Sequence, residues 1–404
     1  MPSLREAHLR HATHYKDVAA NTSQLYLRGG EFVSQALSLF DSEWLNIQAG
    51  QARVAEQVED DNVAAELCAI YPDAGAHCLD LRQHPNGRIR WREAALTAAR
   101  SLGLQRVEAA HLSNLGAAYY RLGESRRAIH YYEQALAINR ELGNRRNEAG
   151  AHGNLGLAYA ELGQVKQALE CYKQALMIGL EIDDGQGVGT NLGSLGAMYT
   201  KLGKVQQAID CFAEALLIHR KTGNRRSESI VLGDLGSAYY QSGNLQRAIE
   251  SYDQQLKIGH EISDRLAESV ALGNLGSAYA KQGDTVRAIE YYEQSLAVSR
   301  EISNRQGEGA ALSNLGGVYA NSGLLQKAME YFRQALAITH RIEDRHTESN
   351  TLFNMALVLD KLGDRVEAVI YAEAALKIFE QVENLNVTKV REQLAEWYGR
   401  VDET

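Results

Sequence analysis

The sequence Asn-Leu-Gly-Ala-Ala-Tyr-Tyr-Arg-Leu-Gly at residues 114–123 is the first of seven similar segments, which follow one another at intervals of 40 residues. It returns as Asn-Leu-Gly-Ser-Ala-Tyr-Ala-Lys-Gln-Gly at 274–283 and as Asn-Met-Ala-Leu-Val-Leu-Asp-Lys-Leu-Gly at 354–363. The second half of each unit repeats as well, from Ala-Ile-His-Tyr-Tyr-Glu-Gln at 128–134 onward. A unit of this length cannot bury its own apolar face, so the period predicts a stacked array.

Each unit contains the pattern of two amphipathic helices. Small or apolar residues recur at i, i+3, i+4 and i+7 from Leu112 to Tyr119, and a similar stripe runs from Ala128 to Leu136. A glycine, which adopts a left-handed conformation at little cost, is expected to end each first helix: Gly123, Gly163, Gly203, Gly243, Gly283, Gly323 and Gly363. Good N-cap residues precede the next first helix: Asn144, Asp184, Asn224, Asp264, Asn304 and Asp344. With strand patterns absent, the sequence predicts an all-α protein.

These residues resemble the tetratricopeptide repeat (TPR) over residues 104–383. The second helix matches the family's pattern of Ala, then Tyr or Phe, then Ala, as at Ala128, Tyr132 and Ala135. The 40-residue unit exceeds the usual 34 and lacks the closing Pro, as in the Leu-Gly-Asn-repeat polarity adaptors and many bacterial signalling proteins. The resemblance implies a right-handed α-solenoid (superhelix) of helix pairs, with the first helices on the concave face.

The sequence divides into four parts on this basis. Residues 1–62 are expected to form a helical cap or junction, 63–103 a degenerate helix pair interrupted near Pro72, 104–383 seven repeats, and 384–404 a capping helix. The stretch Phe40–Gly50, together with His8–Leu27, resembles the junction between the nucleotide-binding module and the TPR arm of bacterial STAND (NB-ARC-type) ATPases. A simple capping helix pair is the alternative, since terminal repeats are atypical.

Composition and motifs argue against several functions. The net charge of −9 over 404 residues disfavours general nucleic-acid binding, and the longest apolar runs are too short for a membrane span. Phosphate-binding Gly-x4-Gly-Lys and His-Glu-x-x-His motifs are missing, so neither an enzyme nor a cofactor is expected. His8, His11 and His14 are poorly spaced for one metal ion, and Cys171 and Cys211 are interpreted as core residues. We expect a cytoplasmic protein.

A ladder of polar residues is the first candidate binding site. In the TPR family the residues beside Leu-Gly face the concave groove. An Asn side chain can both donate to and accept from an extended peptide backbone. The alternative is that each residue bonds to its own or a neighbouring repeat. The candidates for peptide binding, called the ladder below, are Asn114, Asn154, Ser194, Asp234, Asn274, Asn314 and Asn354.

A row of arginines follows the N-caps and is the second candidate. Each has a Glu three residues later, a spacing that permits an ordinary surface ion pair, or each offers donors to acidic groups of a partner. The row consists of Arg145, Arg225, Arg265, Arg305 and Arg345. A partner segment is therefore expected to be a peptide or a protein helix, with acidic groups where it meets the row.

Three functions remain open from the sequence. The first is a scaffold that binds a partner segment in its groove. The second is the sensing arm of a STAND-type ATPase supplied upstream or by another chain. The third is a structural solenoid that associates with itself.

Overall fold

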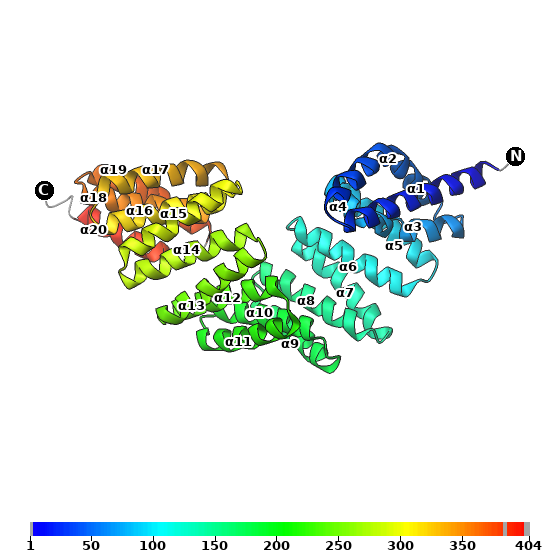
Figure 1. Ribbon diagram of the computed structural model, residues 1–404, viewed down its shortest axis with the longest axis horizontal. Coiled ribbons are helices and arrows are strands. Elements are labelled where there is room, and N and C mark those ends of the chain that lie inside the picture. The colour runs from blue at the N-terminus through cyan, green and yellow to red at the C-terminus, as the bar shows by residue number, and fades with distance from the viewer. Residues whose placement is uncertain (1–2, 383–385, 400–404) are drawn as a thin grey trace. The chain divides into compact units, whose positions relative to one another are not determined.

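The computed structural model describes residues 3–382 and 386–399, and these residues contain helices α1–α20 and no strand (Figure 1). Contacts divide the chain into two compact units, residues 1–198 and 199–404, with the boundary in the last turn of α10. In a stacked array each repeat contacts mainly its neighbours, so contacts between distant parts of the chain are few. The all-α solenoid expected from the sequence is confirmed.

The first unit consists of an N-terminal helical part followed by repeat helices. Its helices are α1 Leu4–Leu27, α2 Glu31–Glu56, α3 Asn62–Ala74, α4 Ala76–Arg82, α5 Pro85–Ser101, α6 Gln105–Arg121, α7 Ser125–Glu141, α8 Arg145–Glu161, α9 Val165–Glu181 and α10 Gly185–Lys201.

The second unit consists of repeat helices closed by one further helix. Its helices are α11 Val205–Thr222, α12 Arg225–Gln241, α13 Leu245–Glu261, α14 Arg265–Gln282, α15 Thr285–Glu301, α16 Arg305–Asn321, α17 Leu325–Arg341, α18 Arg345–Lys361, α19 Arg365–Gln381 and α20 Val387–Gly399.

Helix ends fall where the sequence predicts them. All seven glycines that end the first helices have positive φ, between 69° at Gly163 and 89° at Gly363. Each predicted N-cap accepts a hydrogen bond from the backbone N–H three residues later, as Asn144 does from Asn147 at 3.3 Å and Asp264 from Ala267 at 3.0 Å. These bonds satisfy N–H groups that a helix leaves unpaired in its first turn, so they set where each first helix begins.

The two helices of a repeat pack through an aromatic ring laid against a glycine. A Cβ atom added to Gly116 would lie 2.5 Å from the Tyr132 ring, and one added to Gly156 would lie 2.5 Å from the Tyr172 ring. Phe332 takes the same place against Gly316. The glycine in the repeated motif therefore provides the space for the ring, which is buried in each case.

Helices α1–α5 form a helical module with its own core. Trp91 stacks on Trp44 at 5.8 Å between ring centroids and meets Tyr71 edge-on at the same distance. The interruption expected near Pro72 is present at Gly75, between α3 and α4, while Pro72 itself lies inside α3. Pro72 lies in the last turn of α3 and lacks the N–H for one helical hydrogen bond, and Gly75, which follows, has no Cβ and adds conformational freedom where the helix is interrupted.

The last helix closes the array. Val390, Leu394 and Trp397 of α20 are buried in the same cluster as residues of α18 and α19, as the sequence predicts. The Trp397 indole N–H donates to Asp360 at 3.2 Å. Among the helices that the structure describes, none is long and apolar enough to span a membrane.

Candidate functional site

The ladder lies at equivalent positions in the middle of successive first helices. First helices also contact one another directly, α6 with α8 in the first unit, and α12 with α14, α14 with α16 and α16 with α18 in the second. Asp234 and Asn314 are exposed, while the other ladder side chains are half-buried. The ladder therefore occupies a face that solvent reaches, bordered by closely packed helices.

The five ladder asparagines have no hydrogen-bond partner within residues 3–382 and 386–399, although the Asn residues that cap helices all do. Ser194 differs, since its hydroxyl contacts that of Tyr172. No bond from these asparagines to a neighbouring repeat is therefore present in the part of the chain described. Their amide groups remain open to a ligand.

A pocket of about 760 Å³ opens along the ladder of the first unit. Asn114, Asn154 and Ser194 all line it. Many of its lining residues are Gly, Ala, Ser or Thr, and a Cβ atom added to Gly150 would find no atom within 4 Å. The pocket therefore has room for an extended chain beside three successive ladder positions.

A second pocket, called the α12–α14 pocket below, lies within the second unit and has a volume of about 350 Å³. Asp234 and Asn274 of the ladder line it, and Gln255 of α13 forms part of its wall. Asp234 is exposed at the surface, but the surrounding walls of the pocket reduce its hydration. This loss of hydration raises the pKa of its carboxyl to about 6.

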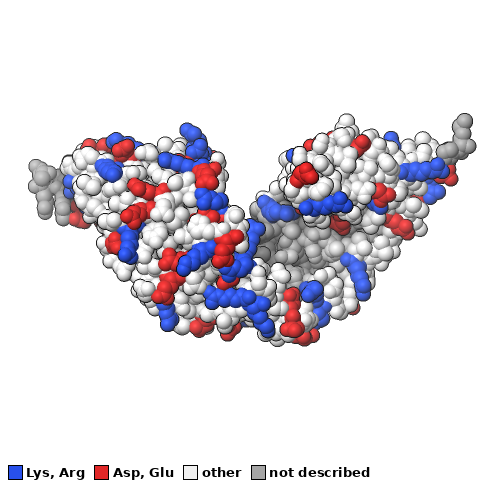
Figure 2. All heavy atoms as spheres, in the orientation of Figure 1, with Lys and Arg blue, Asp and Glu red and all other residues white. Residues whose placement is uncertain are grey.

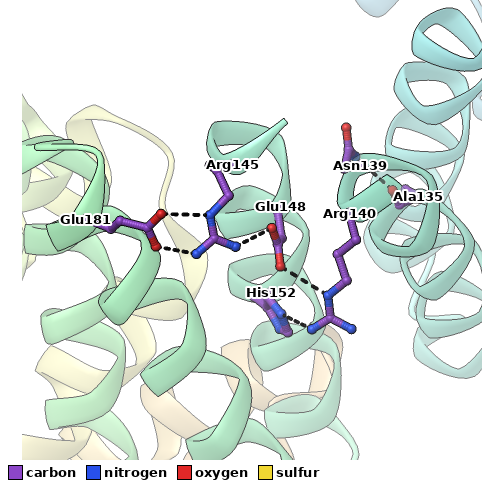
Figure 3. A network of polar contacts seen from close by, with 7 residues as sticks. All are labelled: Ala135, Asn139, Arg140, Arg145, Glu148, His152 and Glu181. Carbon is purple, nitrogen blue, oxygen red and sulfur yellow. Dashed lines mark hydrogen bonds and ion pairs between the residues drawn. The ribbon is translucent and has the colours of Figure 1, made fainter. Parts of the chain in front are cut away.

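The arginine row has internal partners. In the first unit Arg145 lies between two carboxylates, donating from Nη1 to Glu148 at 2.6 Å and from Nε to Glu181 at 3.2 Å (Figure 3). Glu148 also accepts from Arg140 of α7, which in turn contacts His152 at 2.9 Å (Figure 3). Arg145 thus joins three helices of two neighbouring repeats, α7, α8 and α9, through this network.

The rest of the row repeats this arrangement. Arg225 and Arg265 each contact a Glu three residues later and a second Glu on the following helix, Glu261 and Glu301 respectively. Among the described residues, Arg305 and Arg345 pair with the nearer one alone, Glu308 at 2.7 Å and Glu348 at 2.9 Å. The pair is more than an ordinary surface contact, because the nearer glutamate is buried in all five repeats.

Similarity to known proteins identifies the repeat. The sequence profile of the tetratricopeptide repeat matches residues 107–179, 146–221, 187–258, 227–301 and 307–381. The chain belongs to the tetratricopeptide repeat family. A comparison with curated proteins finds no match.

Several solved structures share a similar fold with this chain over more than its repeats. The apo quorum sensor NprR from B. thuringiensis is 14% identical, with a TM-score of 0.60 over 93% of this chain and 100% of that one. A STAND protein with a TPR sensor from Pyrococcus horikoshii is 16% identical, with a TM-score of 0.61 over 94% of this chain and 64% of that one. A Rap protein complexed with competence and sporulation factor is 13% identical, with a TM-score of 0.52 over 87% and 99%. At these identities the likeness concerns the fold.

Sequence reasoning missed two arginines that belong to the TPR pockets. Arg146 lines the pocket of the first unit and Arg226 the α12–α14 pocket, each one residue beyond the predicted row. Both are exposed, and neither forms an ion pair with a described residue. The signal was the doubled Arg-Arg at 145–146 and 225–226, of which only the first residue has a Glu at helical spacing.

Metal binding and cysteine reactivity are the other chemistry that the sequence raised. The described residues contain no group of three His, Cys, Asp or Glu side chains arranged to hold a metal ion. Cys171 is a free, half-buried thiol, and burial raises its pKa to about 11. A thiol with so high a pKa is a poor nucleophile near neutral pH.

Proposed function

We propose that this protein binds an extended segment of a partner protein or peptide along its ladder. The observation that carries the proposal is the set of five asparagines without internal hydrogen bonds on first helices, three of which line pockets. Each carries a donor and an acceptor, which can pair with the C=O and N–H of one backbone unit. Such contacts hold a chain whatever its side chains, so specificity must come from the pockets.

Related folds agree with this proposal. NprR is a quorum sensor, and the Rap protein was solved with competence and sporulation factor bound. Both share the fold of nearly the whole chain described here. A helical solenoid that binds a signalling factor, as the Rap protein does in that complex, is thus a functional parallel for this proposal.

We infer that acidic groups of the segment meet the C-terminal end of the arginine row. Arg305 and Arg345 have one glutamate each, whereas the first three arginines of the row have two. Their guanidinium groups are exposed and retain donors for a second carboxylate. Acidic and basic side chains are interspersed on the visible face of the second unit (Figure 2), so attraction would be local rather than long-range.

The test is the double substitution Asn274→Ala and Asn314→Ala. The full chain is screened against a displayed peptide library, and the affinity of a selected peptide is then measured for both forms. We expect affinity to fall by about tenfold or more, because each lost amide leaves a backbone group of the ligand unpaired. The melting temperature should stay unchanged, since these amides have no partner within the described chain.

A matched control removes two exposed amides of α17, Gln326→Ala with Gln334→Ala, and should leave affinity unchanged. Unaltered affinity in the ladder variant, or a large fall in its melting temperature, would show that the ladder is structural.

A sensor arm for a STAND-type ATPase is the second candidate. It is favoured by α1–α5, which form a module of their own core ahead of the repeats, and by a fold shared with the STAND protein over 94% of this chain. This candidate predicts a STAND-type ATPase encoded beside the chain, and adding the selected peptide to the chain together with that ATPase should change ATP turnover. An ATP turnover that does not change when the peptide is added would contradict a sensing role, but it would not contradict the proposed peptide binding.

A further inference from the structure

The α12–α14 pocket departs from the rest of the array at several positions at once. Asp234 stands where five other repeats have Asn. Gln255 stands where five have Ala: Ala135, Ala175, Ala215, Ala335 and Ala375. In a solenoid made of near-copies, changes gathered around one pocket indicate a local requirement.

Two polar atoms in the wall of this pocket are buried without a partner. Ser229 is 2% exposed and Gln255 5% exposed, and neither the Ser229 hydroxyl nor the Gln255 carbonyl oxygen has a hydrogen bond within the described residues. Gly233 makes room for Gln255, because a Cβ atom there would lie 2.7 Å from the Gln255 amide nitrogen. Burying unpaired polar atoms costs stability. A ligand that donates hydrogen bonds would offset this cost.

Asp234 gives the pocket an unpaired negative charge. It forms no ion pair with a described residue, and loss of hydration is what perturbs its ionisation. Asp264, the other carboxylate of the pocket, is engaged as the N-cap of α14. Arg226 lies in the first turn of α12, eight residues before Asp234. This separation is about 12 Å along the helix axis, so Arg226 is not a helical neighbour of Asp234.

One side of the pocket is aliphatic. Ile230, Leu266 and Val270 line it, and all three are more exposed than is usual for large aliphatic residues. The pocket therefore combines an aliphatic wall with a carboxylate, a carbonyl oxygen and a hydroxyl.

We propose that the α12–α14 pocket binds a lysine or arginine side chain of the partner segment. The aliphatic stem would pack on Ile230, Leu266 and Val270, as long cationic side chains do on apolar surfaces. The charged head would donate to Asp234, and to Gln255 and Ser229 deeper in the wall. This inference rests on the proposed peptide binding and adds to it a preferred residue type at one position.

The test uses four fluorescein-labelled alanine-based hexapeptides that differ at one central residue: lysine, arginine, norleucine or glutamate. Norleucine keeps the lysine stem and lacks its charge. Fluorescence anisotropy with the full chain gives the four affinities. We expect the lysine and arginine peptides to bind about tenfold more tightly than the norleucine peptide, as for a charge-assisted contact.

Asp234→Asn should remove most of this preference without changing the affinity of the norleucine peptide. The matched control is Asp253→Asn on α13, a half-buried aspartate whose pKa is also raised by burial but which is not among the residues lining the pocket. It should leave the preference intact. Equal affinities for lysine and norleucine peptides, or a preference that survives Asp234→Asn, would overturn the inference alone. If none of the four peptides binds, the proposed peptide binding fails as well.

Gln255→Ala separates a binding role from a structural one. The variant has the residue found in five other repeats, so it should fold and should melt at a higher temperature, because a buried carbonyl oxygen without a hydrogen bond is lost. Its affinity for the lysine peptide should fall severalfold. A structural role for Gln255 would instead lower the melting temperature and leave the lysine preference unchanged, and this result would contradict the assignment.

Discussion

Five buried glutamates show how single residues tie one repeat to the next. Each lies in the first turn of a first helix, is 2–6% exposed, and accepts from the arginine three residues earlier: Glu148, Glu228, Glu268, Glu308 and Glu348. Each also contacts an Arg or His side chain eight residues earlier, on the preceding helix: Arg140, Arg220, His260, Arg300 and His340. A carboxylate in this place also interacts favourably with the helix N-terminus.

Replacing one of these carboxylates should therefore destabilise the array. Glu228→Gln leaves Arg220 and Arg225 without their shared partner. Breaking a fully buried pair costs about 3–5 kcal/mol, and we expect about 2 kcal/mol here because both arginines remain partly exposed. Urea unfolding followed by circular dichroism measures the loss. The exposed Glu290→Gln serves as the control, and an equal effect there would contradict the argument.

Within the described part of the chain, four second helices are followed by a left-handed residue that is not glycine. Ser303 has a φ of 56°, whereas glycine occupies the equivalent sites at Gly143 and Gly223. Ser303→Gly should raise the free energy of unfolding by about 0.5–1 kcal/mol, since glycine adopts this conformation without strain. The reverse change, Gly223→Ser, should lower it by a similar amount. If both substitutions raised the free energy of unfolding, backbone strain at this position could not be the cause.

The carboxyl of Asp234 should make stability depend on pH. Its pKa is raised from 3.8 to about 6, so the folded chain holds this proton more tightly than the unfolded chain. The charged form therefore destabilises the fold above about pH 6, and the cost disappears as the pH falls towards 3.8. Asp234→Asn should melt at a higher temperature than the unaltered chain at pH 7.5 and at the same temperature near pH 4. A difference that persists at pH 4 would point to another cause.

At the scale of helices, the two ends of the chain are closed in different ways. The N-terminal end has a module with an aromatic core around Trp91, and the C-terminal end has the single helix α20. Both cover apolar surface that an end repeat would otherwise expose, as terminal caps of repeat proteins must.

The attachment of α20 depends chiefly on Trp397. Trp397→Ala removes a side chain that is 1% exposed and a hydrogen bond to Asp360, a change that typically costs about 3–5 kcal/mol. We expect α20 to detach while α12–α16 remain folded, because contacts are confined to neighbouring helices. Hydrogen exchange should show lost protection in α19 and α20 only. Loss of protection throughout the second unit would mean that the array unfolds as one.

At the scale of the molecule, stability should be built up repeat by repeat. Within a unit a second helix packs on its own first helix and on the first helix of the next repeat, as α7 does on α6 and α8 and as α13 does on α12 and α14. Because long-range contacts beyond neighbouring repeats are few in such arrays, shortened chains can retain their fold.

Two truncations test this additivity. A chain ending at Gly223 keeps α11 and everything before it, and should be folded but less stable than the whole chain. A chain ending at Gly243 adds α12 without its partner α13, and should gain little helical signal by circular dichroism. A full increment of helix at Gly243, or no helix in either chain, would contradict the additive behaviour.

The sequence by itself determined the fold of this protein. The period, the left-handed glycines and the N-caps are local signals, each effective within one or two turns, and they predicted the helix ends and the closing role of Val390, Leu394 and Trp397. Only the tertiary structure decided which polar groups are free. The sequence predicts both Arg145 and Asn154 as binding residues. Packing places two carboxylates on Arg145, whereas Asn154 has no hydrogen-bond partner among the described residues.

The α12–α14 pocket likewise could not be predicted, because Gln255 occupies a repeat position at which five other repeats have a buried core alanine. The burial of a polar atom depends on what the neighbouring helices place around it. That information is spread over three helices and some 50 residues of chain, from Arg226 to Asn274.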